Sequence, residues 1–493
     1  MKNSERSNAE QANDAEARSR VRTTVPLVRF RDARDELASA LRVIRDELEL
    51  PESFSPEVER EAREAAERVR PTGPDLTGIP FITIDPAAST DLDQALHLER
   101  LGDGFRVRYA IADVPAFVEP GGAIDAAARE RGQTLYAPDG RIPLHPTVLS
   151  EGAASLLEGD ERPAFVWTFD LDARGEVTAT TLDRATVRSA RRYSYREAQD
   201  ELDGGAAGDS LTLLPEVGGL RLERERERGG ASLDRPEEEV VLIDGRYRLE
   251  RRSPLPVESW NAQLSLMTGM AAAQIMIDGG IGILRTMPAP DAATIERFRA
   301  QVAAIGCPWP ESQRYGEYLR TLDRADPRGL AVLHAAGALF RGAGYTAFDG
   351  EPPQERIQAA IAAPYAHATA PLRRLVDRFV LVACEALAHA RPVPDWVREA
   401  LPELPAIMGR SDSLASRLDR AAIDAIEAAV LHDRVGERFE AVVIAAKNGG
   451  GTVQLSDPFI SAAVEGEVRA GERVGIVLES ADIATGTIRF RLA

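Results

Sequence analysis

The amino-acid sequence predicts an α+β fold: a large mixed domain, a short helical segment before it and a small closed barrel after it. Three observations lead to this prediction. Helical periodicity dominates before about residue 80, strand-like alternation begins at Phe81, and the last roughly sixty residues read as short strands broken by turns. The length of 493 residues also exceeds one small core and indicates about two to four domains.

Composition is that of a folded protein from a reducing compartment. Hydrophobic residues make up 44% of the chain, and no apolar run is long enough to span a membrane. The N-terminus lacks an apolar signal region, and the two cysteines, Cys307 and Cys384, have no close partner. We therefore expect a cytoplasmic protein, without membrane contact and without a cysteine-based zinc site. A net charge of -19 argues against non-specific coating of nucleic acid, but leaves room for a local basic channel.

The N-terminal part divides into a tail and a helical segment. Residues 1–24 are polar, lack periodicity and are predicted to be disordered. Within residues 25–80, Ser55 and Pro56 mark the start of a second helix, since both residue types favour helix N-termini. The first helix has an apolar face formed by Leu37, Leu41, Ile44 and Leu48.

Residues 81–432 are predicted to form the central domain. The stretches "QALHLER" and "FRVRYAIADV" alternate in polarity and flank Asp103-Gly104, which predicts a β-hairpin. Apolar helices are expected over 257–278, from about Pro371 onward, and over 410–432.

The last segment, residues 433–493, has five strand-sized pieces and suits a small barrel of the OB type. Such barrels commonly bind single-stranded nucleic acid. Its basic and acidic residues nearly balance, so a packing module remains the alternative.

An aspartate cluster follows the first predicted strand. In "TIDPAASTDLDQA", Asp85 ends the strand, and Asp91 and Asp93 point to one side if their segment is extended. Neighbouring carboxylates repel one another, and a hard divalent cation such as Mg²⁺ or Mn²⁺ relieves that repulsion. An acidic surface turn is the alternative, whereas a calcium loop would need a central Gly and a terminal Glu that are missing here.

Several blocks of sequence, in order, resemble the ribonuclease II and ribonuclease R family, whose catalytic domain is called RNB. The resemblance spans about residues 81–400. It implies a metal-dependent, hydrolytic exoribonuclease that degrades single-stranded RNA from 3′ to 5′ and releases nucleoside 5′-monophosphates. The similar blocks are "TIDPAASTDLDQAL", the stretch 109–164, "RSARRYSYREAQ", "VESWNAQLSLMTGMAAA" and "YAHATAPLRRLVDRFV".

By this resemblance, Asp85, Asp91 and Asp93 match three of the family's four active-site aspartates, which hold the metal, and Asp93 is the most critical for turnover. Gln94 stands at the fourth position. A glutamine carbonyl is a metal ligand without charge, so we expect weaker binding of one metal ion.

Two arginines follow Pro371, in what the sequence predicts to be the first turn of a helix, where anions bind well. Arg373 matches the family's catalytic arginine. Arg374 is a second candidate for RNA contact, with an ion pair to Asp377 as the structural alternative.

Two further positions match RNA contacts of the family. Tyr136 matches a tyrosine that stacks on the terminal base, while Leu233 replaces its phenylalanine partner, so the stacking clamp is expected to have one face. Glu258 matches a glutamate that contacts the last ribose, with capping of its helix as the alternative.

The function predicted from the sequence is thus an exoribonuclease, expected to be a monomer, whose partner is single-stranded RNA. One alternative is an RNA-binding regulator that keeps the fold but has lost turnover through Gln94 and Leu233. Another is a phosphodiesterase acting on DNA or short oligonucleotides. Because the roughly 80 residues before the central domain cannot hold two cold-shock domains, we expect RNA entry and product length to differ from the better-known relatives.

Overall fold

A computed structural model describes residues 32–231, 237–243, 246–252, 254–323, 326–337, 339, 341–447, 449–455, 458 and 460–493. The predicted disordered tail, residues 1–24, and Leu233 lie outside the described residues.

Within the described residues, two helices precede the first strand: α2 (Asp32–Glu47) and α3 (Pro56–Arg68). Ser55 caps α3, since its side chain accepts a hydrogen bond from the Val58 backbone N–H at 3.3 Å. The two helices belong to different cores. Leu37 and Leu41 of α2 are buried with the C-terminal barrel, whereas Ala62 of α3 is buried against the central domain. The helical N-terminal segment predicted by the sequence is therefore distributed over the two larger parts of the molecule.

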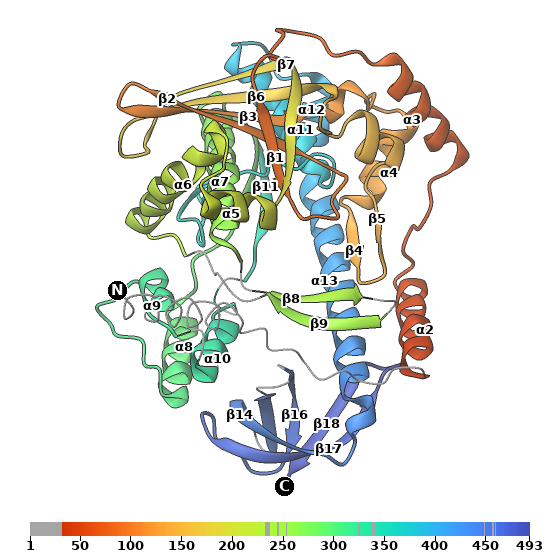
Figure 1. Ribbon diagram of the computed structural model, residues 1–493, viewed down its shortest axis with the longest axis vertical. Coiled ribbons are helices and arrows are strands. Elements are labelled where there is room, and N and C mark those ends of the chain that lie inside the picture. The colour runs from red at the N-terminus through yellow and green to blue at the C-terminus, as the bar shows by residue number, and fades with distance from the viewer. Residues whose placement is uncertain are drawn as a thin grey trace, which may run out of the picture.

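The central domain contains a closed five-stranded barrel, seen at the top of Figure 1. Its strands, in chain order, are β1 (Phe81–Asp85), β2 (Gln94–Leu101), β3 (Gly104–Ala112), β6 (Glu161–Leu171) and β7 (Val177–Ser194). Neighbours pair antiparallel, except that β1 closes the barrel by running parallel to β7. The predicted hairpin at Asp103-Gly104 is present, and Gly102 supplies the positive φ of 58° that the turn requires.

The strands of this barrel bury both faces, so their side chains alternate between two cores. On β6, Phe165, Trp167 and Phe169 enter the larger core, and Ala164 and Val166 enter the second. The surrounding helices in chain order are η1 (Val114–Ala116), α4 (Ala123–Arg131), η2 (Leu149–Ala153), α5 (Tyr195–Gly204), α6 (Asp209–Arg228), α7 (Pro256–Gly279), α11 (Leu375–Ala388) and α12 (Asp395–Ala400). The apolar helix predicted over 257–278 is α7, and it contacts α11.

Four two-stranded hairpins or ribbons complete the central domain: β4 (Leu135–Ala137) with β5 (Gly140–Ile142), β8 (Glu237–Ile243) with β9 (Arg246–Arg252), β10 (Ile281–Thr286) with β11 (Gly344–Asp349), and β12 (Ile357–Gln358) with β13 (Ala363–Pro364). Between β10 and β11 lie three helices: α8 (Ala292–Ile305), α9 (Tyr315–Arg320) and α10 (Pro327–Ala336). They enclose a small aromatic core in which Trp309 stacks on Tyr318, with ring centroids 5.8 Å apart.

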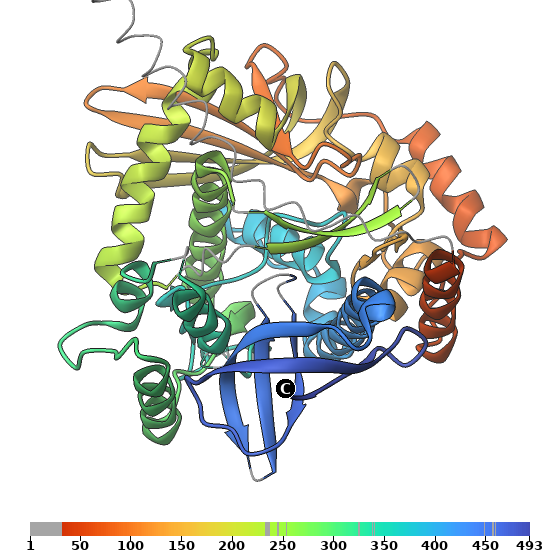
Figure 2. The same cartoon turned by 60° about the horizontal axis from the view of Figure 1, so that its bottom comes forward.

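The long helix α13 (Leu404–Leu431) begins six residues before the predicted start at about 410 and leads through η3 (His432–Arg434) into the C-terminal barrel. That barrel consists of β14 (Arg438–Lys447), β15 (Gly450–Leu455), β16 (Ser461–Glu465), β17 (Arg473–Asp482) and β18 (Thr487–Leu492). It is closed in the order β14-β15-β16-β18-β17, which confirms the predicted OB-type fold. Figures 1 and 2 show α13 running from the central domain to this barrel, with α2 beside it. Among the helices described, none is both long and apolar enough to cross a membrane.

Candidate active site

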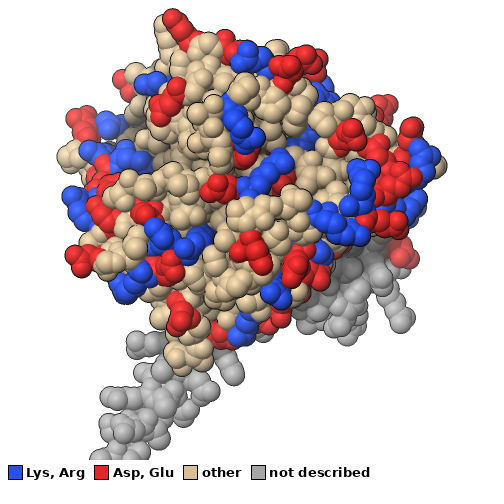
Figure 3. All heavy atoms as spheres, turned by 90° about the horizontal axis from the view of Figure 1, so that it is seen from above, with Lys and Arg blue, Asp and Glu red and all other residues tan. Residues whose placement is uncertain are grey.

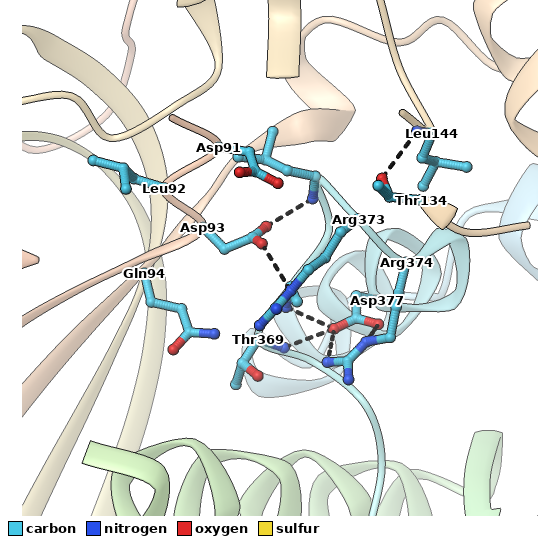
Figure 4. Close-up of polar contacts among 12 residues, drawn as sticks. Asp91, Leu92, Asp93, Gln94, Thr134, Leu144, Thr369, Arg373, Arg374 and Asp377 are labelled. Carbon is cyan, nitrogen blue, oxygen red and sulfur yellow. Dashed lines mark hydrogen bonds and ion pairs between the residues drawn. The ribbon is translucent and has the colours of Figure 1, made fainter. Parts of the chain in front are cut away.

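Three of the predicted ligands lie where the sequence placed them, at the end of β1 and just before β2. Asp85 is the last residue of β1, and Asp91 and Asp93 lie in the segment that enters β2. In Figure 4, Asp91 and Asp93 point to one side of this segment and Leu92 points to the other. Leu92 is fully buried, and its backbone N–H donates to Ser155 Oγ at 2.9 Å. The buried leucine therefore fixes the direction in which both aspartates point.

Asp93 faces a segment that lies 279 residues further along the chain. Its Oδ1 accepts the Leu372 backbone N–H at 2.7 Å, and its Oδ2 lies 3.4 Å from Nε of Arg373. Asp93 is only 3% exposed, whereas the Arg373 side chain is 47% exposed. Figure 4 shows the Arg373 side chain beside the Asp93 carboxylate.

The helix expected from Pro371 onward begins later than the sequence predicts. α11 starts at Leu375, and Arg374 precedes it with extended backbone angles. Instead, the backbone of this stretch forms hydrogen bonds with residues far away in the same chain. The N–H of Thr134 donates to the Arg373 carbonyl at 2.9 Å, and the N–H of Leu375 donates to the Gly132 carbonyl at 3.0 Å. Arg373 consequently lies in a pinned turn, so the predicted position in a first helical turn was wrong.

Asp377 organises this turn from inside the protein. It is fully buried, and its Oδ1 accepts the backbone N–H groups of Thr369 at 2.9 Å and Ala370 at 2.7 Å. Arg374 donates to both carboxylate oxygens, from Nε at 2.9 Å and from Nη2 at 2.8 Å. The ion pair that the sequence left open for Arg374 is present, and it is a fork of the kind that fixes geometry well.

Burial controls the protonation of the two inner carboxylates. It raises the pKa of Asp85 to about 6 and that of Asp93 to about 8, although Arg373 lowers both pKa values. Asp85 Oδ2 is buried and has no hydrogen-bond partner. The burial of Asp93 outweighs its contact with Arg373. A divalent cation would stabilise the ionised forms of both carboxylates.

The other two predicted ligands already have protein partners. Asp91 Oδ1 is 2.8 Å from Nη1 of Arg141, and its Oδ2 accepts the Tyr136 hydroxyl at 3.4 Å. Gln94 Oε1 accepts the hydroxyl of Tyr109, which is buried. Within the described residues, accordingly, no ready group of three or more Asp, Glu, His or Cys side chains surrounds one point. Among the four predicted ligands, as the structure describes them, Asp85 Oδ2 is the buried oxygen without a protein partner.

Sequence reasoning missed Arg141. It is the cross-strand partner of Tyr136 in the β4–β5 hairpin, so the two side chains share one face. Besides Asp91, the Arg141 guanidinium contacts Glu151 Oε1 at 2.7 Å and Thr90 Oγ1 at 2.6 Å. The tight turn signal in "APDG" placed Arg141 opposite Tyr136 and would have identified it.

Two known domain families match the chain. An RNB domain matches residues 74–389, and the C-terminal S1 domain of RNase II-type exonucleases matches residues 437–493. The chain belongs to the RNB-domain family. Exoribonucleases of this family depend on divalent metals, which agrees with the chemistry of the carboxylate pair.

Three proteins illustrate the range of RNB relatives. Ribonuclease R of Escherichia coli K12 is 26% identical over 443 residues, which is 84% of this chain and 54% of that protein, so the chain spans about half the length of that relative. The structure of Mycoplasma genitalium RNase R in complex with ribose-methylated single-stranded RNA has a TM-score of 0.84 at 18% identity, covering 93% of this chain and 78% of the other. Yeast Ssd1, described as a pseudonuclease, has a TM-score of 0.71 at 18% identity, covering 90% and 58%. The RNB fold therefore occurs both with and without nuclease activity.

At the edge of the RNB site, Glu258 caps α7. Its Oε1 accepts the Leu255 backbone N–H at 2.8 Å and also pairs with Arg252. The capping alternative left open by the sequence is thus present, and both contacts use Oε1. One turn later, Asn261 Nδ2 donates to the Ile84 carbonyl at 3.3 Å, which holds α7 against the strand that ends in Asp85.

Proposed function

We propose that the chain is a metal-dependent hydrolytic exoribonuclease that degrades single-stranded RNA from 3′ to 5′ and releases nucleoside 5′-monophosphates. The observation that carries the proposal is the meeting of opposite charges. Partly buried Asp85 and buried Asp93 lie on one side, and half-exposed Arg373, whose Nε is 3.4 Å from Asp93 Oδ2, lies on the other. A phosphodiester needs both charges, one to hold a cation and one to neutralise charge on the phosphate.

The carboxylates hold and orient the cation. Asp85 and Asp93 would bind Mg²⁺ or Mn²⁺, with Asp91 and Gln94 as further oxygen ligands if they exchange their present partners. When bound, such an ion activates water and stabilises charge on the phosphate oxygens. Asp93 is the central ligand, since the Leu372 N–H and Leu92 hold it in position.

Arg373 and Arg374 have different roles. Arg373 is exposed enough to reach a phosphate, to which a guanidinium donates two parallel hydrogen bonds. Arg374 has Nε and Nη2 engaged with Asp377, so we limit its RNA contact to Nη1. Its main effect is to hold the turn from which Arg373 projects.

Tyr136 offers a stacking face for the terminal base. Its side chain is 53% exposed, and its hydroxyl is tethered to Asp91 at 3.4 Å. Burial of the hydroxyl end, together with the Asp91 charge, raises the pKa of Tyr136 to about 12, so the ring stays neutral. A flat aromatic reads any base by its face, which suits a sequence-tolerant nuclease. Glu258 would add a ribose contact through Oε2, which distinguishes RNA from DNA.

The proposal extends to the division of the chain. We propose a catalytic domain over 81–432 and an RNA-binding OB barrel over 433–493. The face seen in Figure 3 carries acidic and basic side chains interspersed, which suits a protein that admits RNA at one path and does not coat it.

The test is a time course on 5′-labelled single-stranded RNA with Mg²⁺ and then Mn²⁺. We expect progressive shortening from the 3′ end by the natural protein. Asp93→Asn should abolish it, while Asp103→Asn, in the exposed turn between β2 and β3, should not. A matched DNA strand, tested in parallel, should remain intact.

A second candidate is an RNA-binding regulator without turnover. Two observations favour it: Gln94 Oε1 is occupied by Tyr109, and Asp91 is neutralised by Arg141. The pseudonuclease Ssd1 has the same fold. RNA binding without shortening in either metal would select this alternative, and shortening of DNA as well would select the general phosphodiesterase.

A further inference from the structure

The β4–β5 hairpin has one face in the site and one face against the N-terminal segment. Tyr136 and Arg141 form one cross-strand pair, and Leu135 and Ile142 form the next. Neighbouring pairs of a hairpin point to opposite faces. Tyr136 and Arg141 contact Asp91, so whatever holds the opposite face also sets the position of the proposed stacking ring.

That opposite face is covered by the end of α2 and by α13. Leu135 is 3% and Ile142 is 6% exposed, and both are buried in one cluster with Leu50 and Leu418. Leu50 lies in the short segment after α2, which ends at Glu47, and Leu418 belongs to α13. The back of the hairpin is therefore a small apolar core to which the N-terminal segment contributes.

The tip of the hairpin is held by charge. Arg45, in the last turn of α2, pairs with Asp139 in the two-residue loop between β4 and β5. Both side chains are largely shielded, at 21% and 23% exposure. Arg45 also lies 3.7 Å from Glu52 just beyond α2. Because a two-residue loop has little freedom, fixing Asp139 limits how far the whole hairpin moves.

The base of the hairpin is held by the segment that follows α2. Arg131, at the end of α4, donates to the Ser53 carbonyl at 2.7 Å and to the Pro143 carbonyl at 3.2 Å. Its guanidinium lies over the Phe54 ring, 3.8 Å from the centroid. Residues 48–54 therefore contact the hairpin in two places: directly at its apolar face, and through Arg131 at its base.

At its other side, α2 is attached to the C-terminal barrel. Leu37, Ala40 and Leu41 are buried in one core with Ile426 of α13 and Phe439 of β14. One short helix therefore connects the barrel that we propose binds RNA with the hairpin that presents Tyr136 (Figures 1 and 2).

We propose that α2 and residues 48–54 form a brace that positions Tyr136 and Arg141 for the 3′ end of the RNA, with Arg45 as its positioning residue. This inference rests on the proposed function, since it assigns the brace to the grip on RNA. Packing alone would require Leu50 but not a specific charge pair at the tip, so Arg45 and Asp139 are the residues that distinguish the two roles.

The experiment compares Arg45→Ala, Asp139→Ala and the charge-reversed pair Arg45→Asp with Asp139→Arg. Arg63→Ala is the matched control, because Arg63 makes an exposed ion pair with Glu59 on the neighbouring helix α3. For each protein we would measure KM and kcat on 5′-labelled single-stranded RNA, and amide hydrogen exchange across residues 135–142.

Each single variant should raise KM about fivefold with little change in kcat, as the loss of one partly shielded ion pair predicts. Amides of residues 135–142 should exchange faster, and the charge-reversed pair should restore both values. Unchanged KM and exchange in Arg45→Ala would overturn the proposal. A raised KM with unchanged exchange would also overturn it, because Arg45 would then act directly on RNA. If the natural protein does not shorten RNA, the proposed function fails, and RNA affinity replaces KM in judging the brace.

Discussion

Asp377 gives the sharpest prediction, because a single buried carboxylate holds the turn that presents Arg373. Asp377→Ala removes four hydrogen bonds, two from backbone N–H groups and two from Arg374. It also leaves the Arg374 guanidinium, 22% exposed, without its partner. Breaking one side of a buried ion pair costs about 3–5 kcal/mol. At an m-value of about 3 kcal/mol per M, the urea midpoint then falls by about 1 to 1.7 M.

The same change should damage catalysis beyond its effect on stability. Arg373 lies in the turn that Asp377→Ala would release. A shift of about 1 Å in a catalytic group costs about a hundredfold in rate. We therefore expect kcat/KM on single-stranded RNA to fall by about that factor, measured well below the urea midpoint, where the protein is folded.

Two controls make the test decisive. The double variant Arg374→Met with Asp377→Ala should unfold at higher urea than Asp377→Ala alone, since it no longer buries an unpaired charge. Asp170→Ala, which breaks the more exposed pair with Arg106, should cost only about 1 kcal/mol or less. A wild-type urea midpoint together with wild-type kcat/KM in Asp377→Ala would refute the reasoning.

Four further outcomes follow from the site. Burial raises the pKa of Asp85 to about 6 and that of Asp93 to about 8. The affinity for Mn²⁺, measured by calorimetry, should therefore rise from pH 6 to 8. In Asp93→Asn, the rise of this affinity near pH 8 should be smaller. By the same shift, the metal-free protein, followed by thermal unfolding, should lose stability as pH rises from about 4 through about 8, since ionisation of Asp93 is easier in the unfolded chain. Gln94→Asp adds a charged ligand and should tighten Mg²⁺ binding about tenfold; an unchanged titration would contradict this. Tyr136→Ala should raise KM at least about fivefold through lost stacking, whereas Tyr136→Phe should stay near the natural value.

The parts of the molecule that were predictable from sequence are those governed by local patterns. The strand ending at Asp85, the turn at Asp103-Gly104 and the closed C-terminal barrel follow from alternation and turn residues, and the structure contains all three. The alternation also explains why Asp91 and Asp93 share a side, although the segment is not part of a strand.

What the sequence did not predict depends on partners far along the chain. The start of α11 at Leu375 is set by hydrogen bonds to Gly132 and Thr134, which leave no periodic signal. The pairing of Arg141 with Asp91 joins residues 50 positions apart. For Arg374 and Glu258, the sequence offered two roles each, and only the observed contacts with Asp377 and Leu255 show that the structural role is filled.

The long separation between Asp93 and Arg373 has a consequence for synthesis. Leu372, the residue before Arg373, contacts Asp93 across 279 residues, and Arg373 is close to the end of its domain in a chain of 493. Domains fold from the N-terminus as the chain leaves the ribosome. A growing chain therefore displays Asp85, Asp91 and Asp93 long before Arg373 exists, so the complete site cannot assemble early in synthesis. The site is complete only after α11 has been synthesised and the turn before it has formed its hydrogen bonds with residues 132–134.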